Sequence, residues 1–240
     1  TGEKKTMESV LDRVIKQNTE NVNLLKTKDY NIFSVLQIQS KEVLICRMIA
    51  DLLNPRGQHG AGAEYLKIFL RDCLGMEKMD TKLADQAIVT AEYPIDDERR
   101  IDIVIEIGSY FLPIEVKIYA ADQKSQCFDY YQYAKRRDAQ AKVYYLTLDG
   151  HRPGKDSTSS GSQSVPEEDI VCLSFREHIL NWLKACESCE NTGMVPILEQ
   201  FIRNIEQISG YTSERVRSMV IDELLTSGDS LRAGMQIADS

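Results

Sequence analysis

The sequence lacks the features that mark membrane-spanning and secreted proteins. No apolar run reaches the roughly 18 to 20 residues that a membrane-spanning helix requires. The first ten residues, TGEKKTMESV, do not have the charged-then-apolar layout of a secretory signal. The six cysteines are dispersed through 240 residues, unlike the disulfide framework of a small secreted domain. We therefore expect a cytoplasmic protein with reduced thiols and no membrane partner.

An excess of positive charge is also missing. The chain has 29 Lys and Arg residues against 37 Asp and Glu residues, which gives a formal net charge of −8. A protein that binds nucleic acid through bulk charge needs Lys and Arg across its contact face. Any nucleic-acid binding must therefore use a local basic patch. Cys186 and Cys189 form the only CxxC pair, without a second pair or a nearby His, which favours a helix-end coincidence over a zinc half-site.

The length and composition allow a large buried core. Hydrophobic residues make up 42% of the chain, so one large domain or one domain with an extension is expected. We assign residues 1–210 to a single domain and residues 211–240 to a C-terminal helical extension. The chain begins without Met, so we expect it to be a trimmed piece of a longer protein.

Hydrophobic periodicity predicts a mixed sheet flanked by helices, because segments with helical spacing alternate with β-rich segments. Ser40 is the expected N-cap of the second helix, which should end at Asn54-Pro55, and Gly75 should end the third. Helices are expected at 7–25, 40–55, 62–75, 123–137, 176–186 and 195–208. Strands are expected at 86–95, at the two arms of a hairpin inside 99–126, and at 142–148 and 169–175.

The last two expected strands are separated by a long Gly-, Ser- and Pro-rich segment, residues 149–169. This composition is typical of a mobile loop, which would serve either as a lid over a site or simply as an insertion.

The segment RRIDIVIEIGSYFLPIEVKIYAADQKSQ, residues 99–126, places two carboxylates on neighbouring strands. With Gly108 and Ser109 as a two-residue type II′ loop, paired residue numbers sum to 217, so Asp102 faces Glu115. Side chains alternate between the two faces of a strand. The charged face should carry Arg100, Asp102, Glu115 and Lys117, and the apolar face Ile101, Ile103, Ile105, Leu112, Ile114 and Val116.

Two opposed carboxylates destabilise a sheet, because their Cβ atoms lie about 4.5 to 5.5 Å apart. A divalent cation offsets this repulsion, and Mg²⁺ is commonly held by one or two carboxylates together with water and phosphate oxygens. Lys117 would then orient or deprotonate an attacking water, or stabilise the charge of the transition state. The alternative is a surface hairpin with ordinary solvated charges, in which Lys117 and Arg100 bridge the acids. The residues alone leave both interpretations open.

The spacing of these residues resembles that of the PD-(D/E)xK nuclease superfamily. Twelve residues separate Asp102 from Glu115-Val116-Lys117, and the hairpin has a helix before and after it. The context segments are ADLLNPRGQHGAGAEYLKIFL, RRID and IEVKIYAADQKSQCFDYYQY, and the resemblance covers roughly residues 30–150. The set looks like a bacterial, defence-associated branch of the superfamily. Ile101-Asp102 replaces the Pro-Asp dipeptide, a change that many members share.

The resemblance implies a restriction-endonuclease-like α/β fold with helical additions at both ends of the chain. It also implies a metal-dependent phosphodiesterase in which Asp102 and Glu115 hold Mg²⁺ or Mn²⁺ and Lys117 is catalytic. Similar nucleases carry a glutamate on the helix before the sheet, for which Glu42 is the matching candidate. Glu42 equally suits the positive end of a helix dipole. Glu92 on the preceding strand is a rival third carboxylate, with an ordinary exposed residue as its alternative.

Five further residues are candidates for substrate binding. Gln126 and Tyr130 lie four residues apart on one helix face and resemble a QxxxY element that lines substrate in related nucleases. Lys124 lies near the start of the same helix, and Arg100 shares the charged face of the hairpin. The alternative for this helix is an aromatic stripe that packs on the sheet. His59 belongs to the upstream resemblance, although a loop histidine is more often a structural hydrogen-bonding residue.

The function expected from these observations is hydrolysis of nucleic-acid phosphodiester bonds, with DNA as the preferred substrate. The alternative is a nuclease-derived module that binds nucleic acid or a partner without cleaving. In either case a protein partner or a homodimer is compatible with the helical extension. Intact Asp102, Glu115 and Lys117 favour the enzyme, whereas the net acidity leaves room for the binding module.

Overall fold

The computed structural model describes residues 30–77, 79–189 and 193–210. Contacts divide the chain into two compact units, of which one is Ile32–Ser209 and the other comprises Thr1–Asn31 and Gly210–Ser240. The helix expected at 7–25 and the extension expected at 211–240 lie outside the described residues. The expected domain boundary after residue 210 therefore stays a prediction.

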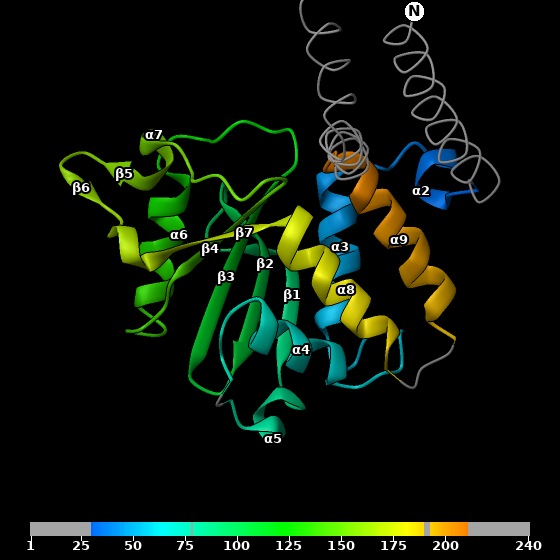
Figure 1. The fold of residues 1–240 in the computed structure, drawn as a ribbon. Helices are drawn as coiled ribbons and strands as arrows, with labels where there is room; N and C mark the ends of the chain where they lie inside the picture. Colours follow the sequence, from blue (N-terminus) through cyan, green and yellow to red (C-terminus); the bar gives the residue numbers. More distant parts are fainter. Residues whose placement is uncertain (1–29, 78, 190–192, 211–240) are drawn as a thin grey trace, which may run out of the picture. The chain divides into compact units, whose positions relative to one another are not determined.

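A five-stranded mixed sheet forms the centre of the Ile32–Ser209 unit, in the order β1-β2-β3-β4-β7 (Figure 1). The first three neighbours are antiparallel, and β4 and β7 continue the sheet in parallel with β3. Parallel neighbours need crossover connections, which explains the helical segments between them. The strands are β1 (Ile88–Pro94), β2 (Arg100–Ile107), β3 (Tyr110–Lys117), β4 (Val143–Thr147) and β7 (Ile170–Ser174). The predicted mixed sheet is confirmed.

The β2–β3 hairpin has the predicted register. Its pairs run from Ile107–Tyr110 to Ile103–Ile114, and their residue numbers sum to 217. Gly108 has a φ of 58°, a value that glycine adopts readily at the first position of a type II′ loop.

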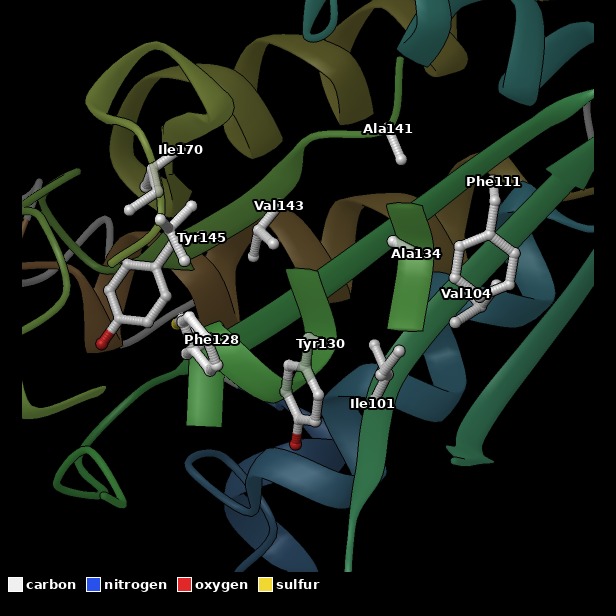
Figure 2. Packing of buried hydrophobic residues seen from close by; sticks show 12 residues of the cluster. Ile101, Val104, Phe111, Phe128, Tyr130, Ala134, Ala141, Val143, Tyr145 and Ile170 are labelled. Atoms are coloured by element: carbon white, nitrogen blue, oxygen red, sulfur yellow. The ribbon is translucent and has the colours of Figure 1, made fainter. Parts of the chain in front are cut away.

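The predicted alternation of faces is wrong for Ile101. This residue belongs to the buried cluster that also contains Val104, Phe111 and Tyr130 (Figure 2), and Ile103 is not part of that cluster. The β1–β2 pairing passes over Glu92 and Asp102, and Glu92 adopts a φ of 53°. The strands are therefore irregular at this point, and period-two alternation does not extend through it.

The helix α3 (Glu42–Leu53) packs across β1, β2 and β3. Ser40 is not its N-cap, because the helix begins one residue later than predicted, with Lys41 as the cap and without a capping side chain. The carbonyl oxygen of Lys41 accepts hydrogen bonds from the amides of Leu44 and Ile45. The C-terminal end at Asn54 agrees with the prediction, since proline follows and disfavours helical geometry there.

The longer helices lie on both sides of the sheet. The helix α6 (Gln126–Lys135) lies to one side of the strands, and α3, α8 (Leu180–Glu187) and α9 (Val195–Ile208) lie to the other (Figure 1). Trp182 on α8 is fully buried, and its indole N–H donates to the carbonyl oxygen of Tyr65 on α4 over 2.8 Å. Gly75, with a φ of 65°, follows α4 three residues beyond its last helical residue. The other described helical elements outside residues 149–169 are α2 (Ile32–Val35), α4 (Glu64–Asp72), α5 (Thr81–Ala84) and η2 (Phe175–Ile179, a π-helical turn).

Residues 149–169, here called the insertion, do not form the irregular loop that their composition predicts. Ser157 is completely buried, and its Oγ accepts a hydrogen bond from the amide of Cys127 on α6 over 3.3 Å. Order in this segment comes from contacts with α6, which composition does not record. The insertion contains α7 (Lys155–Thr158), the hairpin of β5 (Ser159–Ser160) and β6 (Gln163–Ser164), and the 3-10 turn η1 (Glu167–Asp169).

Within the described ranges 30–77, 79–189 and 193–210, no helix is both long and apolar enough to cross a bilayer.

Candidate active site

The two ionisable residues at the end of β3 are buried. Only 1% of Glu115 and 7% of Lys117 is exposed. β3 lies inside the sheet, where Glu115 is paired with Tyr145 and Lys117 with Thr147 on β4. The alternative of a surface hairpin with ordinary solvated charges is therefore wrong for these two residues.

Asp102 lies one residue beyond the last β2–β3 pair, where the strands stop exchanging backbone hydrogen bonds. Its Oδ2 accepts a hydrogen bond of 2.8 Å from the amide of Val116, between Glu115 and Lys117. The side chain thus takes the place of the missing strand partner. This bond orients the Asp102 carboxylate toward the end of β3.

Glu115 is the most strained charge of the group. The Nζ of Lys117 lies 2.5 Å from its Oε1, and the Asp102 carboxylate is the other charged neighbour of Glu115. Burial raises the pKa of Glu115 well above its usual range, and the neighbouring Asp102 charge raises it further. Two buried carboxylates that share one cation are costly, and a second positive group would compensate them.

The other two charges are shifted by the same surroundings. Burial raises the pKa of Asp102, although the amide of Val116 opposes this effect. Burial alone would lower the pKa of Lys117, but the charges of Glu115, Asp102 and Glu42 together raise it above its usual value. An ammonium group at this position is suited to stabilising negative charge.

The structure brings Glu42 to this group. Its Oε2 accepts a hydrogen bond of 2.8 Å from the amide of Ile118, directly after Lys117. Cys46 follows Glu42 by one helical turn, and burial, then Asp102, Glu42 and Glu115, raise the pKa of its thiol. The N-terminal turn of α3 thus faces the carboxylates.

Glu92, the rival third carboxylate, is engaged elsewhere. Its Oε2 accepts hydrogen bonds from Arg47 on α3, with Nη2 at 2.6 Å and Nε at 3.0 Å. Glu42 is therefore the better placed of the two candidates.

The residues fit a metal that is held partly by water. Among the residues that the structure describes, no three side chains of His, Cys, Asp or Glu form a ready-made metal-binding group. Two adjacent carboxylates are nevertheless sufficient for Mg²⁺, which keeps several waters in its shell. Glu115 and the adjacent Asp102 provide such a pair, and a cation there would offset both burial and repulsion.

Gln126 and Tyr130 do share one face of α6, as predicted, but both are buried, with 6% and 1% exposed. The Nε2 of Gln126 donates to the hydroxyl of Tyr130 over 3.0 Å. That hydroxyl donates in turn to the carbonyl oxygen of Arg100 on β2. Their burial argues against direct substrate contact and for a role in fastening α6 to β2.

The predicted phosphate-binding residues Arg100 and Lys124 have exposed side chains. Lys124 belongs to residues 118–125, here called the site loop, which joins β3 to α6. Both side chains are accessible to a ligand, and both residues are close in sequence to Asp102 or Glu115. Their assignment to substrate stays a prediction.

His59 is only 4% exposed, and its ring stacks on Tyr65 with a centroid distance of 4.8 Å. Its Nδ1 accepts from the amide of Ala61, which leaves Nε2–H to donate to the carbonyl oxygen of Asn54 over 2.9 Å. The structure therefore supports the structural alternative for His59, as an organiser of the loop between α3 and α4.

Two residues near the site escaped the sequence analysis. Arg99 makes three hydrogen bonds to α6 and the site loop. Asp122 in the site loop accepts from the hydroxyl of Tyr145 and from the amide of Gly154, each over 2.6 Å. The RRID motif drew attention to Arg100 only, and no sequence signal connects Asp122 with the insertion.

The sheet, its flanking helices and the acidic end of β3 define an α/β protein with a restriction-endonuclease-like fold. A family model described as the PD-(D/E)XK nuclease superfamily matches residues 30–204. The chain belongs to the PD-(D/E)XK nuclease superfamily. No curated protein matches the chain, and no solved structure does either.

Proposed function

We propose that the protein is a metal-dependent nuclease that hydrolyses phosphodiester bonds of nucleic acid, with DNA as the substrate. The observation that carries this proposal is the buried cluster of Asp102, Glu115 and Lys117, in which Glu115 is only 1% exposed and its Oε1 lies 2.5 Å from the Lys117 Nζ. Proteins seldom retain a buried, poorly compensated charge without a functional reason. Membership of the superfamily supports the same chemistry.

Asp102 and Glu115 would hold Mg²⁺ or Mn²⁺, with Glu42 nearby to complete the shell directly or through water. When bound, such an ion polarises a phosphoryl oxygen and lowers the pKa of coordinated water. As an ammonium ion, Lys117 would place positive charge where the phosphoryl group becomes more negative.

Arg100 and Lys124 provide exposed positive charge close in sequence to the carboxylates. We assign them to phosphate groups of the bound strand, since exposed cations near the carboxylates would position the backbone without reading bases. Binding should therefore weaken with salt. The proposal also places the protein inside the cell, as part of a defence against foreign nucleic acid.

The decisive test is cleavage of labelled single- and double-stranded DNA and RNA with Mg²⁺, Mn²⁺ or EDTA. Wild type should cut DNA only with metal. Glu115→Gln and Lys117→Met should each reduce the rate by at least about 100-fold. Glu106→Gln is the matched control, because Glu106 lies on the same hairpin and forms a partly exposed ion pair with Arg137.

The outcome that would replace this proposal is nucleic-acid binding without cleavage in any metal. That result would favour the non-cleaving module. Cleavage that persists unchanged in both site variants, with correctly folded protein, would place the active site elsewhere.

A further inference from the structure

Arg99 fastens the beginning of β2 to two other segments. Its Nε donates to Asp129 on α6 over 3.1 Å, and its Nη1 donates to Gln123 over 2.8 Å. Its Nη2 donates to the carbonyl oxygen of Lys124 over 2.5 Å. Only 21% of the Arg99 side chain is exposed. One guanidinium therefore joins a strand, a helix and the site loop.

The carbonyl group of the next residue, Arg100, is also held by α6. The carbonyl oxygen of Arg100 accepts the hydroxyl hydrogen of Tyr130, and Gln126 donates to that hydroxyl. The carbonyl oxygen of the Gln126 side chain also accepts from the amide of Gln123 over 3.4 Å. Two consecutive residues of the chain, Arg99 and Arg100, are thus both bound to α6.

The contacts of Arg99 and Arg100 lie just before Asp102, a residue that the backbone pairing of β2 with β3 does not hold. Asp102 follows Arg100 by two residues and lies beyond the last β2–β3 pair, at Ile103–Ile114. Its path toward the end of β3 depends on how the chain enters β2. A planar guanidinium that donates to three acceptors restricts this entry more strongly than a single hydrogen bond would.

We propose that Arg99 is a positioning residue that sets the Asp102 carboxylate, and with it the metal affinity of the site, by fixing the start of β2 against α6 and the site loop. This inference rests on the proposed function in one respect, since it requires that Asp102 holds a metal. Residues that orient metal ligands typically change metal affinity or activity by 10- to 100-fold when they are replaced.

Arg137 provides a matched control within the same pair of elements. It follows α6 and also joins it to β2, donating from Nη2 to the hydroxyl of Tyr133 over 2.9 Å and from Nη1 to Glu106 over 3.3 Å. Its guanidinium also lies against the rings of Tyr93 and Phe111. Loss of Arg137 should loosen the same α6–β2 contact near the hairpin turn, away from Asp102.

The experiment titrates Mn²⁺ into wild type, Arg99→Gln, Arg99→Lys and Arg137→Gln without nucleic acid, with the thermal midpoint and the calorimetric dissociation constant as readouts. Arg99→Gln should raise the dissociation constant for Mn²⁺ about tenfold. Arg99→Lys should give an intermediate value, because a single ammonium cannot satisfy three acceptors in a fixed fork. Arg137→Gln should lower the thermal midpoint but bind Mn²⁺ as wild type does.

Equal Mn²⁺ affinity in Arg99→Gln and Arg137→Gln would overturn the proposal and leave Arg99 as a structural clamp. Should Arg99→Gln fail to fold, Arg99→Lys and Asp129→Asn decide instead, and unchanged affinity in both would also overturn it. A wild type that binds Mn²⁺ but cleaves nothing would reject the nuclease function while leaving this inference testable by affinity. A wild type that binds no Mn²⁺ would reject the inference itself.

Discussion

Two glutamate–cation pairs on the β2–β3 hairpin show how differently one interaction behaves at two depths. Near the turn, Glu106 and Arg137 are 3.3 Å apart, with 31% and 43% of their side chains exposed. At the open end, Glu115 and Lys117 are 2.5 Å apart, with 1% and 8% exposed. Water screens the first pair, so it contributes little stability. The second pair has lost its hydration and can cost more than it returns.

The difference separates structural charges from functional ones. Glu106 could be replaced by many residues without consequence for the core. Glu115 occupies an interior strand position paired with Tyr145, and it is accompanied there by Asp102 and Glu42. The hairpin thus concentrates its electrostatic strain at one end.

Removal of the buried cation should have the largest effect on stability. Lys117→Met leaves the Glu115 carboxylate buried without its partner, which should lower the free energy of unfolding by about 3 kcal/mol. Glu106→Gln at the other end should change it by less than about 1 kcal/mol. Urea denaturation in EDTA measures both values. Similar losses in the two variants would erase the distinction between the two ends.

Removal of both charges should then restore most of that loss. In Glu115→Gln/Lys117→Met no ion remains to be desolvated, so the double variant should recover roughly 2 kcal/mol relative to Lys117→Met alone. Cleavage should stay abolished. The same denaturation series, with activity assayed on each sample, tests whether stability and function separate. A double variant as unstable as the single one would mean that packing, not charge, determines the cost.

Metal should stabilise wild type more than a variant with one carboxylate fewer. For a dissociation constant near 1 mM and about 10 mM Mg²⁺, binding contributes roughly 1.4 kcal/mol, or on the order of 3 to 6 °C. Asp102→Asn keeps an oxygen that can accept from Val116 but removes the charge. It should melt higher than wild type in EDTA and gain less from Mg²⁺. Thermal melts at one ionic strength provide the comparison, and equal gains would remove Asp102 from the metal site.

The smallest expected effect distinguishes the two candidates for a third carboxylate. Glu42→Gln keeps an acceptor for the amide of Ile118, yet it should reduce the metal-induced gain by up to about 1 kcal/mol. Glu92→Gln disturbs only the pair with Arg47 and should leave the gain intact. Melts of both variants with and without Mn²⁺ measure the difference. A loss confined to Glu92→Gln would reverse the assignment.

Much of the fold followed from local pattern. The Gly108-Ser109 turn determined the hairpin register correctly, because a two-residue loop allows few alternatives. That register alone places Asp102, Glu115 and Lys117 together on one face of the hairpin. Apolar periodicity likewise predicted α3, α6, α8 and α9 close to their observed positions.

Burial of the site could not be predicted in the same way. The charged face of the hairpin suggested solvent, because antiparallel strands often have one wet face. β3 instead has β4 as a parallel neighbour and α6 packed against it, and these contacts come from residues distant in sequence. Arg99 was missed for a similar reason, since its partners Gln123, Lys124 and Asp129 lie 24 to 30 positions away.

The insertion offers a practical route to observing the site at work. Its base is bound to the loop before α6, through Ser125 N–H to the carbonyl oxygen of Asp156 and through Gly154 N–H to Asp122. Its tip at Gly161 has open space around it, with no heavy atom within 4 Å of an added Cβ. A cysteine introduced at the exposed position of Ser162, beside this tip, would carry a fluorophore. Changes in its emission would then report whether the insertion stays attached while metal and nucleic acid bind.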